Sequence, residues 1–213
     1  MSNKPTRKHS SLWILLAILF VAVATPASQT PTAQAGQLFD FLWQKKSLET
    51  VVDSITQRYP DVAHIKTSEL AKKMNANPDI ILIDVRETDE YQVSHLRGAI
   101  HAPPDTSTRK LVNLLPPKIK GRAVVFYCSV GERSSAMAKR TQLKLKELGA
   151  TAIYNLKGGI FAWHNEKRPL VNAAGPTDYV HPFDNDWGRL VKRQKKTRMS
   201  IAPSQKKELE NTP

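Results

Sequence analysis

Cysteine is almost absent from this chain: Cys128 is the single example among 213 residues, so no disulfide can form within the chain. Histidine is also sparse. The six histidines lie at positions 9, 64, 95, 101, 164 and 181, and no two of them have the spacing of a pair of metal ligands. One cysteine and scattered histidines argue against a zinc site. The adjacent Gly158 and Gly159 lack the further glycines of a nucleotide-binding loop and predict a tight turn instead. We therefore expect no metal and no cofactor.

Long apolar runs are also lacking. The run at residues 12–24 would span about 20 Å as a helix, short of the roughly 30 Å of a membrane core. It follows a basic start and precedes small residues that fit cleavage after Ala27 or Ala35. We predict that residues 1–27 are a signal peptide and that the protein is exported, to the periplasm if it is bacterial. An uncleaved N-terminal anchor, with the protein facing outside the cytoplasm, is the alternative.

Acidic residues are few relative to basic ones, 19 against 32, which gives a formal net charge of +13. A basic surface favours small anionic substrates and anionic lipid headgroups. For an exported chain we expect no nucleic-acid partner. Six basic residues lie within residues 188–199, which we interpret as a solvated tail, with contact to an anionic membrane or acidic partner as the alternative. The sequence gives no indication of the oligomeric state.

The region around Cys128 carries the most information. Residues 123–126 form a β-branched and aromatic run typical of a buried strand, and residues 134–148 are typical of a helix closed by Gly149. Cys128 therefore lies where a strand gives way to a helix. Helix N-termini hold anions and favour a thiolate. A buried cysteine packed as a small hydrophobe is the alternative, but the polar residues after Cys128 do not continue a packed strand.

We predict that Cys128 is a nucleophile and that the following loop binds an anionic substrate. The loop's N–H groups would stabilise negative charge, and its terminal arginine would attract the anion. The predicted substrate-binding residues are Ser129, Val130, Gly131, Glu132 and Arg133.

Three segments carry a family resemblance. Asp84-Val85-Arg86, Glu90-Tyr91 and residues 95–100 resemble the DVR…EY…GHIPGAI stretch of the rhodanese-type sulfurtransferases. Residues 128–134 resemble their CxxGxRS loop, and residues 154–163 their NLxGGxxAW segment. Ser94 and Arg97 depart from the usual Gly and Pro. The resemblance covers residues 60–172, about one domain, and is that of a single-domain, exported form.

The resemblance implies a thiosulfate sulfurtransferase that works through a persulfide on Cys128. A donor such as thiosulfate would supply a sulfane sulfur, and a thiol or cyanide would accept it. The alternative is a non-catalytic module that binds a partner protein or an anion. Related phosphatases and arsenate reductases have five residues between the cysteine and the arginine, whereas this chain has four. That shorter loop disfavours both activities.

Strands that alternate with helices predict an α/β fold with a mostly parallel, five-stranded sheet and helices on both faces. Residues 28–59 are predicted to be a linker and an amphipathic helix, for which membrane-surface contact is an alternative to packing on the domain. Residues 173–213 form a C-terminal extension with the basic tail. Asp84 and Arg86 are interpreted as a structural ion pair.

Overall fold

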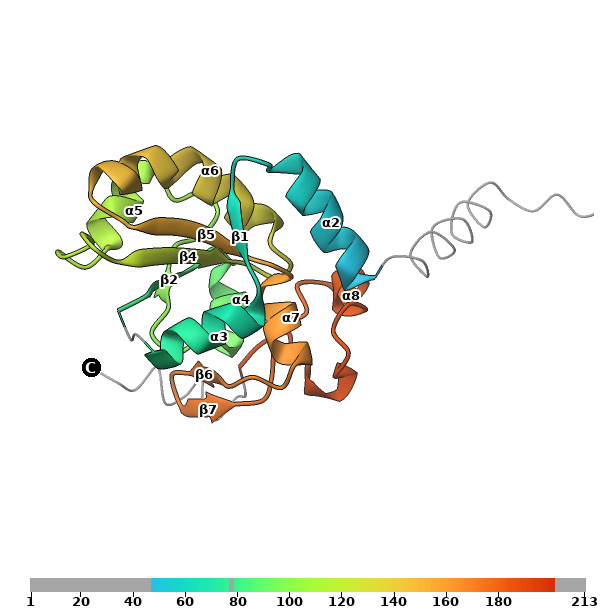
Figure 1. The fold of residues 1–213 in the computed structure, drawn as a ribbon. Coiled ribbons are helices and arrows are strands. Elements are labelled where there is room, and N and C mark those ends of the chain that lie inside the picture. The colour runs from blue at the N-terminus through green and yellow to red at the C-terminus, as the bar shows by residue number, and fades with distance from the viewer. Residues whose placement is uncertain (1–46, 77–78, 202–213) are drawn as a thin grey trace, which may run out of the picture. The chain divides into compact units, whose positions relative to one another are not determined.

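The chain forms a five-stranded, wholly parallel sheet in the computed structural model, which describes residues 47–76 and 79–201 (Figure 1). Its order is β1-β5-β4-β2-β3. The strands are β1 (Ala63–Ile65), β2 (Ile81–Asp84), β3 (Ile100–His101), β4 (Ala123–Tyr127) and β5 (Ala152–Leu156). The prediction of a parallel five-stranded α/β fold is confirmed. The predicted signal segment lies outside the described residues.

Helices cover both faces of the sheet, as predicted. Figure 1 shows α5 and α6 on one face and α3, α4 and α7 on the other. The helices are α2 (Leu48–Arg58), α3 (Thr67–Ala76), α4 (Thr88–Val93), α5 (Thr108–Leu114), α6 (Glu132–Glu147), α7 (Gly159–Asn165) and α8 (Asn185–Gly188). A short antiparallel pair, β6 (Leu170–Asn172) and β7 (Gly175–Thr177), and a 3₁₀ turn (Gln194–Lys196) follow α7.

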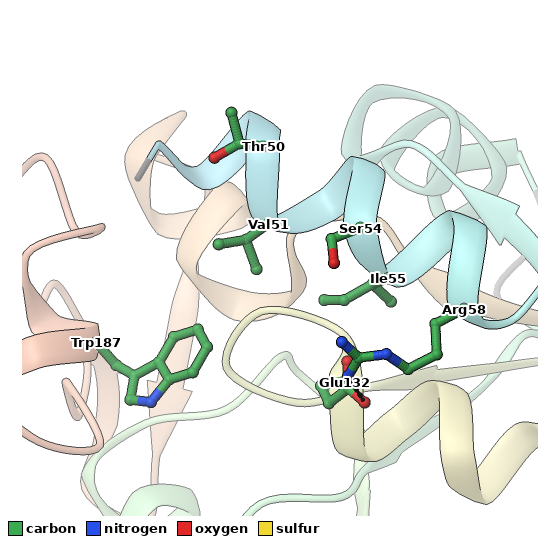
Figure 2. Close-up of a pocket in the computed structure, with 7 residues that line it drawn as sticks. All are labelled: Thr50, Val51, Ser54, Ile55, Arg58, Glu132 and Trp187. Carbon is green, nitrogen blue, oxygen red and sulfur yellow. Dashed lines mark hydrogen bonds and ion pairs between the residues drawn. The ribbon is translucent and has the colours of Figure 1, made fainter. Parts of the chain in front are cut away.

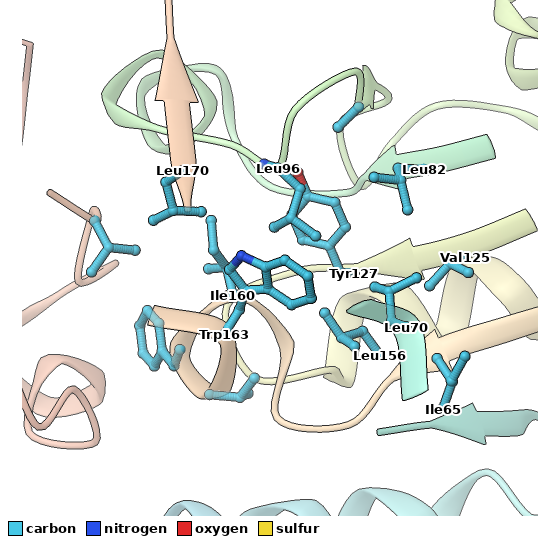
Figure 3. Packing of buried hydrophobic residues seen from close by; sticks show 14 of the residues in the cluster. Ile65, Leu70, Leu82, Leu96, Val125, Tyr127, Leu156, Ile160, Trp163 and Leu170 are labelled. Carbon is cyan, nitrogen blue, oxygen red and sulfur yellow. Dashed lines mark hydrogen bonds between the residues drawn. The ribbon is translucent and has the colours of Figure 1, made fainter. Parts of the chain in front are cut away.

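Two apolar clusters flank the sheet because successive strand residues point to opposite faces. On β4, Val125 and Tyr127 join the cluster that contains α3 and α7 (Figure 3), whereas Val124 and Phe126 join the cluster under α5 and α6. β4 is the central strand and is buried along most of its length. The residue that follows it is therefore held by a rigid support.

The predicted helix before the domain is confirmed over residues 48–58. Ser47 and Thr50 form a reciprocal capping box at its start. Val51 and Ile55 bury its apolar stripe in the same cluster as α7. The other residues of the predicted linker, 28–46, lie outside the described residues.

Helix α6 starts earlier than predicted, at Glu132 instead of Ser134. Gly131 is its N-cap and has a φ of 113°, a left-handed conformation that glycine adopts without steric cost. The chain can therefore turn from β4 into the helix over only a few residues. The loop after β4 is thus residues 128–131, which we call the cysteine loop, and Arg133 belongs to the first turn of α6.

The segment after residue 173 folds back on the domain. Leu190 and Val191 are buried in the main core, and Val180 pairs with Thr197 in a parallel bridge. The interpretation of residues 188–199 as a solvated tail was therefore wrong. Two basic residues of this segment form ion pairs with Asp178, which precedes the segment in the sequence. Arg193 lies 3.2 Å and Lys196 3.6 Å from the Asp178 carboxylate.

The predicted ion pair between Asp84 and Arg86 is confirmed and lies at the end of β2. Both side chains are 0% exposed, and Arg86 donates to the carboxylate through Nε (2.9 Å) and Nη2 (2.6 Å). Arg86 Nη2 also donates to the carbonyl of Ser94, one of the two positions that depart from the family pattern. The pair thereby links β2 to the turn after α4.

Removal of one partner from this pair should be costly, because it leaves a buried charge without compensation. We expect Asp84→Ala to lower the free energy of unfolding by about 3–5 kcal/mol, measured by urea denaturation. The double variant Asp84→Ala/Arg86→Met should recover part of that loss. Lys144→Ala breaks the exposed pair with Glu147 and should cost at most about 1 kcal/mol. Equal losses at the buried and exposed pairs would refute this assignment.

Candidate active site

Cys128 lies at the carboxyl end of the central strand, the edge at which parallel α/β sheets bind ligands. The residue is 1% exposed, and it is one of the residues that line a pocket. The Gly131 N–H donates a hydrogen bond to Sγ at 3.2 Å. The cysteine loop therefore curls around its own sulfur, as expected for a cradle that holds negative charge there.

Helix α7 fixes the cysteine loop from behind. The N–H groups of Ile160 and Phe161 donate to the carbonyl oxygens of Cys128 (2.9 Å) and Ser129 (3.0 Å). In a trans peptide the N–H of the next residue points opposite to the carbonyl. The N–H groups of Ser129 and Val130 are therefore directed away from α7.

Gly159 makes this close approach possible. Its φ is 53°, and a Cβ built on it would lie 2.2 Å from the carbonyl oxygen of Cys128. No larger residue fits without a shift of the loop backbone. The predicted tight turn at Gly158 and Gly159 thus has a specific purpose: it brings α7 into hydrogen-bond range of the cysteine loop.

The first turn of α6 adds to the positive potential around Sγ. Glu132, Arg133 and Ser134 occupy the first three positions of this 16-residue helix, so their N–H groups have no acceptor within the helix. Such a terminus stabilises anions and thiolates. Together with Gly131, it supplies backbone donors at the place where a charged sulfur would lie.

Arg133 is bound by a buried carboxylate that the sequence interpretation did not assign to the site. Arg133 donates hydrogen bonds to both carboxylate oxygens of Glu90, from Nη1 at 2.7 Å and from Nη2 at 2.9 Å. The Ser129 hydroxyl also donates to Glu90, at 2.7 Å. Glu90 is 2% exposed. Its one signal in the sequence was its place in the Glu90-Tyr91 motif. Glu90 thereby links α4 to Ser129 of the cysteine loop and to Arg133 of α6.

This network sets the ionisation of Glu90. Burial raises the pKa of the carboxyl, but hydrogen bonds and positive charge from Arg133, with help from Arg86 and Ser129, outweigh it. The net result is a pKa below the usual value, so Glu90 is ionised at neutral pH. The charge of Arg133 is largely offset within the protein.

Glu132 connects the site to α2. Its Oε1 accepts hydrogen bonds from Arg58 at 2.9 Å and from the Tyr59 hydroxyl at 3.0 Å. Burial, followed by the hydrogen bond to Glu132, raises the pKa of Tyr59, so its hydroxyl remains protonated and donates. Glu132 thus forms part of the pocket rim while its carboxylate faces α2.

The pocket over Cys128 has a volume of about 250 Å³. Four of the five predicted binding residues line it, and the fifth, Gly131, binds Sγ directly. Phe183 and Trp187 of the C-terminal extension complete its wall. Both residues are more than 50 positions from Cys128 in the sequence, and no sequence pattern predicted that they would lie beside it.

The fold is thus an α/β protein with a parallel sheet, in which a cysteine follows the central strand and its sulfur accepts a hydrogen bond from the loop backbone. A family model, the rhodanese-like domain, matches residues 66–166. This chain belongs to the rhodanese-like family, and the resemblance inferred from its motifs is confirmed.

The chain is similar to several proteins of known name. A thiosulfate sulfurtransferase, GlpE, of Coxiella burnetii is 32% identical over 105 residues, which cover 49% of this chain and 87% of that protein. A tRNA uridine(34) hydroxylase of Escherichia fergusonii is 28% identical, over 62% of this chain but only 38% of that protein. The polysulfide-sulfur transferase homodimer of Wolinella succinogenes is 25% identical, with a TM-score of 0.43, over 59% of this chain and 90% of that one.

The contact between α7 and the cysteine loop predicts a marked effect of Gly159→Ala. The added Cβ must push away two loop carbonyls, so we expect the free energy of unfolding to fall by about 3 kcal/mol. Gly98→Ala is the matched control, because Gly98 also has a positive φ but has nothing within 4 Å of the added Cβ. It should cost about 1 kcal/mol. Urea denaturation measures both variants, and equal losses would contradict the proposed contact.

The lowered pKa of Glu90 predicts how stability depends on pH. A depressed native pKa stabilises the fold above the unfolded value, near 4.5, and this contribution is lost as the pH falls through the native pKa. Glu90→Gln should therefore cost about 2 kcal/mol at pH 7 and progressively less below about pH 4.5. Urea denaturation between pH 3 and 7 tests this prediction. A difference in the free energy of unfolding between the wild type and Glu90→Gln that stays constant with pH would refute it.

Proposed function

We propose that this protein is an exported sulfurtransferase that moves a sulfane sulfur through a persulfide on Cys128. The donor is thiosulfate or a similar small anion, and the acceptor is a thiol or cyanide. The observation that carries the proposal is the geometry at Cys128: Sγ accepts a hydrogen bond from the Gly131 N–H at 3.2 Å, beside the N-terminus of α6, and the residue lines a pocket. The name of the Coxiella burnetii relative agrees with this chemistry.

In the first step, the Cys128 thiolate attacks the outer sulfur of thiosulfate. A bond forms between Sγ and that sulfur, the sulfur–sulfur bond of thiosulfate breaks, and sulfite leaves with the bonding pair. The terminal sulfur of the resulting persulfide carries negative charge. Backbone N–H groups of the cysteine loop and the first turn of α6 are placed to stabilise it.

In the second step, an acceptor thiolate attacks the terminal sulfur. The new bond forms on the acceptor, the bond to Sγ breaks, and Cys128 leaves as a thiolate, ready for the next donor. With cyanide the product is thiocyanate. Neither step needs a redox cofactor or a general base once the acceptor is ionised.

Arg133 acts in this proposal chiefly as an organiser. Its two hydrogen bonds to Glu90 and its contact with Ser129 at 2.9 Å hold the segment that follows Cys128. Attraction of the anionic donor then depends on the helix terminus and on the basic surface as a whole.

Export and membrane contact remain proposals from the sequence. Among residues 47–76 and 79–201, no helix has the length and apolar character of a membrane span. The charged residues after Gly188 and the segment before α2 are candidates for contact with an anionic membrane surface. We propose no nucleic-acid partner.

The direct test is to incubate the purified protein with thiosulfate and to weigh it intact by mass spectrometry. We expect the wild type to gain the mass of one sulfur atom, because the thiolate displaces sulfite and retains the outer sulfur. A thiol or cyanide should remove the gain. Cys128→Ser, the matched control, should show none.

Each other outcome points to a different function. Absence of a gain on a reduced, accessible Cys128 would reject thiosulfate as the donor and favour a binding module. Turnover of a phosphate ester or of arsenate, abolished by Cys128→Ser, would favour the phosphatase or reductase alternatives.

A further inference from the structure

Part of the pocket wall over Cys128 comes from outside the matched family region. Residues 66–166 supply the floor and the loop, whereas Phe183 and Trp187 come from the C-terminal extension. The family match therefore does not account for these two aromatic side chains beside Cys128.

Phe183 is held over the site at a conformational cost. Its φ is 72°, a left-handed conformation that bulky residues rarely adopt. Its N–H donates to Nδ1 of His181 at 3.0 Å, and its ring stacks on the Arg133 guanidinium, with 4.9 Å from Cζ to the ring centre. The residue is nevertheless 40% exposed. A strained, exposed aromatic residue beside a reactive cysteine suggests a binding role.

Trp187 lines the Cys128 pocket and also a second pocket of about 310 Å³, whose residues Figure 2 shows. The backbone N–H of Trp187 donates a hydrogen bond to the Asp184 carboxylate at 2.8 Å, which caps the short helix α8. Val51, Ile55 and Arg58 of α2 also line the second pocket, together with Glu132. Trp187 and Glu132 line both pockets, so the two adjoin.

The size and charge of these pockets suit an organic ligand that is larger than a small inorganic anion. Glu90 offsets Arg133, and Arg58 offsets Glu132, so the charged groups beside Cys128 are paired within the protein. The combined space falls in the range used for organic ligands. Aromatic rings contact apolar groups and polarisable sulfur favourably.

We propose that the physiological sulfur acceptor is an organic thiol with an apolar or aromatic group next to its sulfur, which Phe183 and Trp187 recognise. This inference rests on the proposed function. The acceptor thiolate attacks the terminal sulfur of the Cys128 persulfide, the organic persulfide leaves, and the Cys128 thiolate is restored. Phe183 and Trp187 select the acceptor by contact with its apolar group.

The experiment first loads Cys128 with sulfur from thiosulfate and confirms loading by intact mass. The loaded protein then reacts with benzyl mercaptan or 2-mercaptoethanol, thiols of similar acidity that differ in the apolar group. We expect kcat/KM to favour benzyl mercaptan by about tenfold or more in the wild type. Phe183→Ala should reduce this preference about fivefold, while Phe183→Leu should retain most of it. Leu143→Ala, which truncates a 73% exposed apolar residue outside both pockets, should leave the preference unchanged.

The outcomes separate this inference from the function on which it rests. Failure of the wild type to load would remove the proposed function and the inference with it. Loading with no preference for benzyl mercaptan, or with the same preference in Phe183→Ala and Leu143→Ala, would overturn the inference alone. Trp187→Phe, which keeps an aromatic ring in the core, should weaken the preference and provides a second test should Phe183→Ala fail to fold.

Discussion

Helix α7 is the element on which the site depends. Its first N–H groups bind the carbonyl oxygens of Cys128 and Ser129, which sets the direction of the cysteine loop. At its other end, the Asn165 side chain donates to the Leu190 carbonyl at 3.0 Å and accepts the Lys192 N–H at 2.7 Å. This seven-residue helix therefore positions both the floor of the pocket and the extension that supplies its wall. Its close approach to the loop requires glycine at position 159.

The electrostatics of the site come from the backbone more than from free charges. Arg133 is paired with Glu90, and Glu132 with Arg58, so neither side chain presents an uncompensated charge to the pocket. Around Sγ lie the Gly131 N–H and the N-terminus of α6, and the Arg133 guanidinium also interacts with the Cys128 side chain. Fixed backbone dipoles need no rearrangement when a sulfur anion forms. Such a cradle suits a persulfide, in which the charge resides on one small atom next to the loop.

Sequence reasoning reached the sheet, its helical layers and the position of Cys128, because these depend on local periodicity and on where a strand ends. The ion pair between Asp84 and Arg86 could also be predicted from the sequence, because the two residues are only two positions apart. The contact of Glu90 with Arg133 spans 43 positions and was missed, because no local pattern encodes it. The same reason hid Phe183 from the site. The early start of α6 depended on the backbone of one glycine, Gly131. The basic segment folds back with Leu190 and Val191 buried in the core, a contact that no local pattern encodes.

The central claim is that backbone N–H groups hold a transferable sulfur on Cys128. A crystal structure of the thiosulfate-treated protein tests it most directly. The account predicts electron density for one additional sulfur bonded to Sγ, within hydrogen-bond distance of N–H groups of the cysteine loop or of the first turn of α6. An unmodified Sγ, with an intact oxyanion bound in the pocket above it, would contradict the account and make Cys128 part of a binding site.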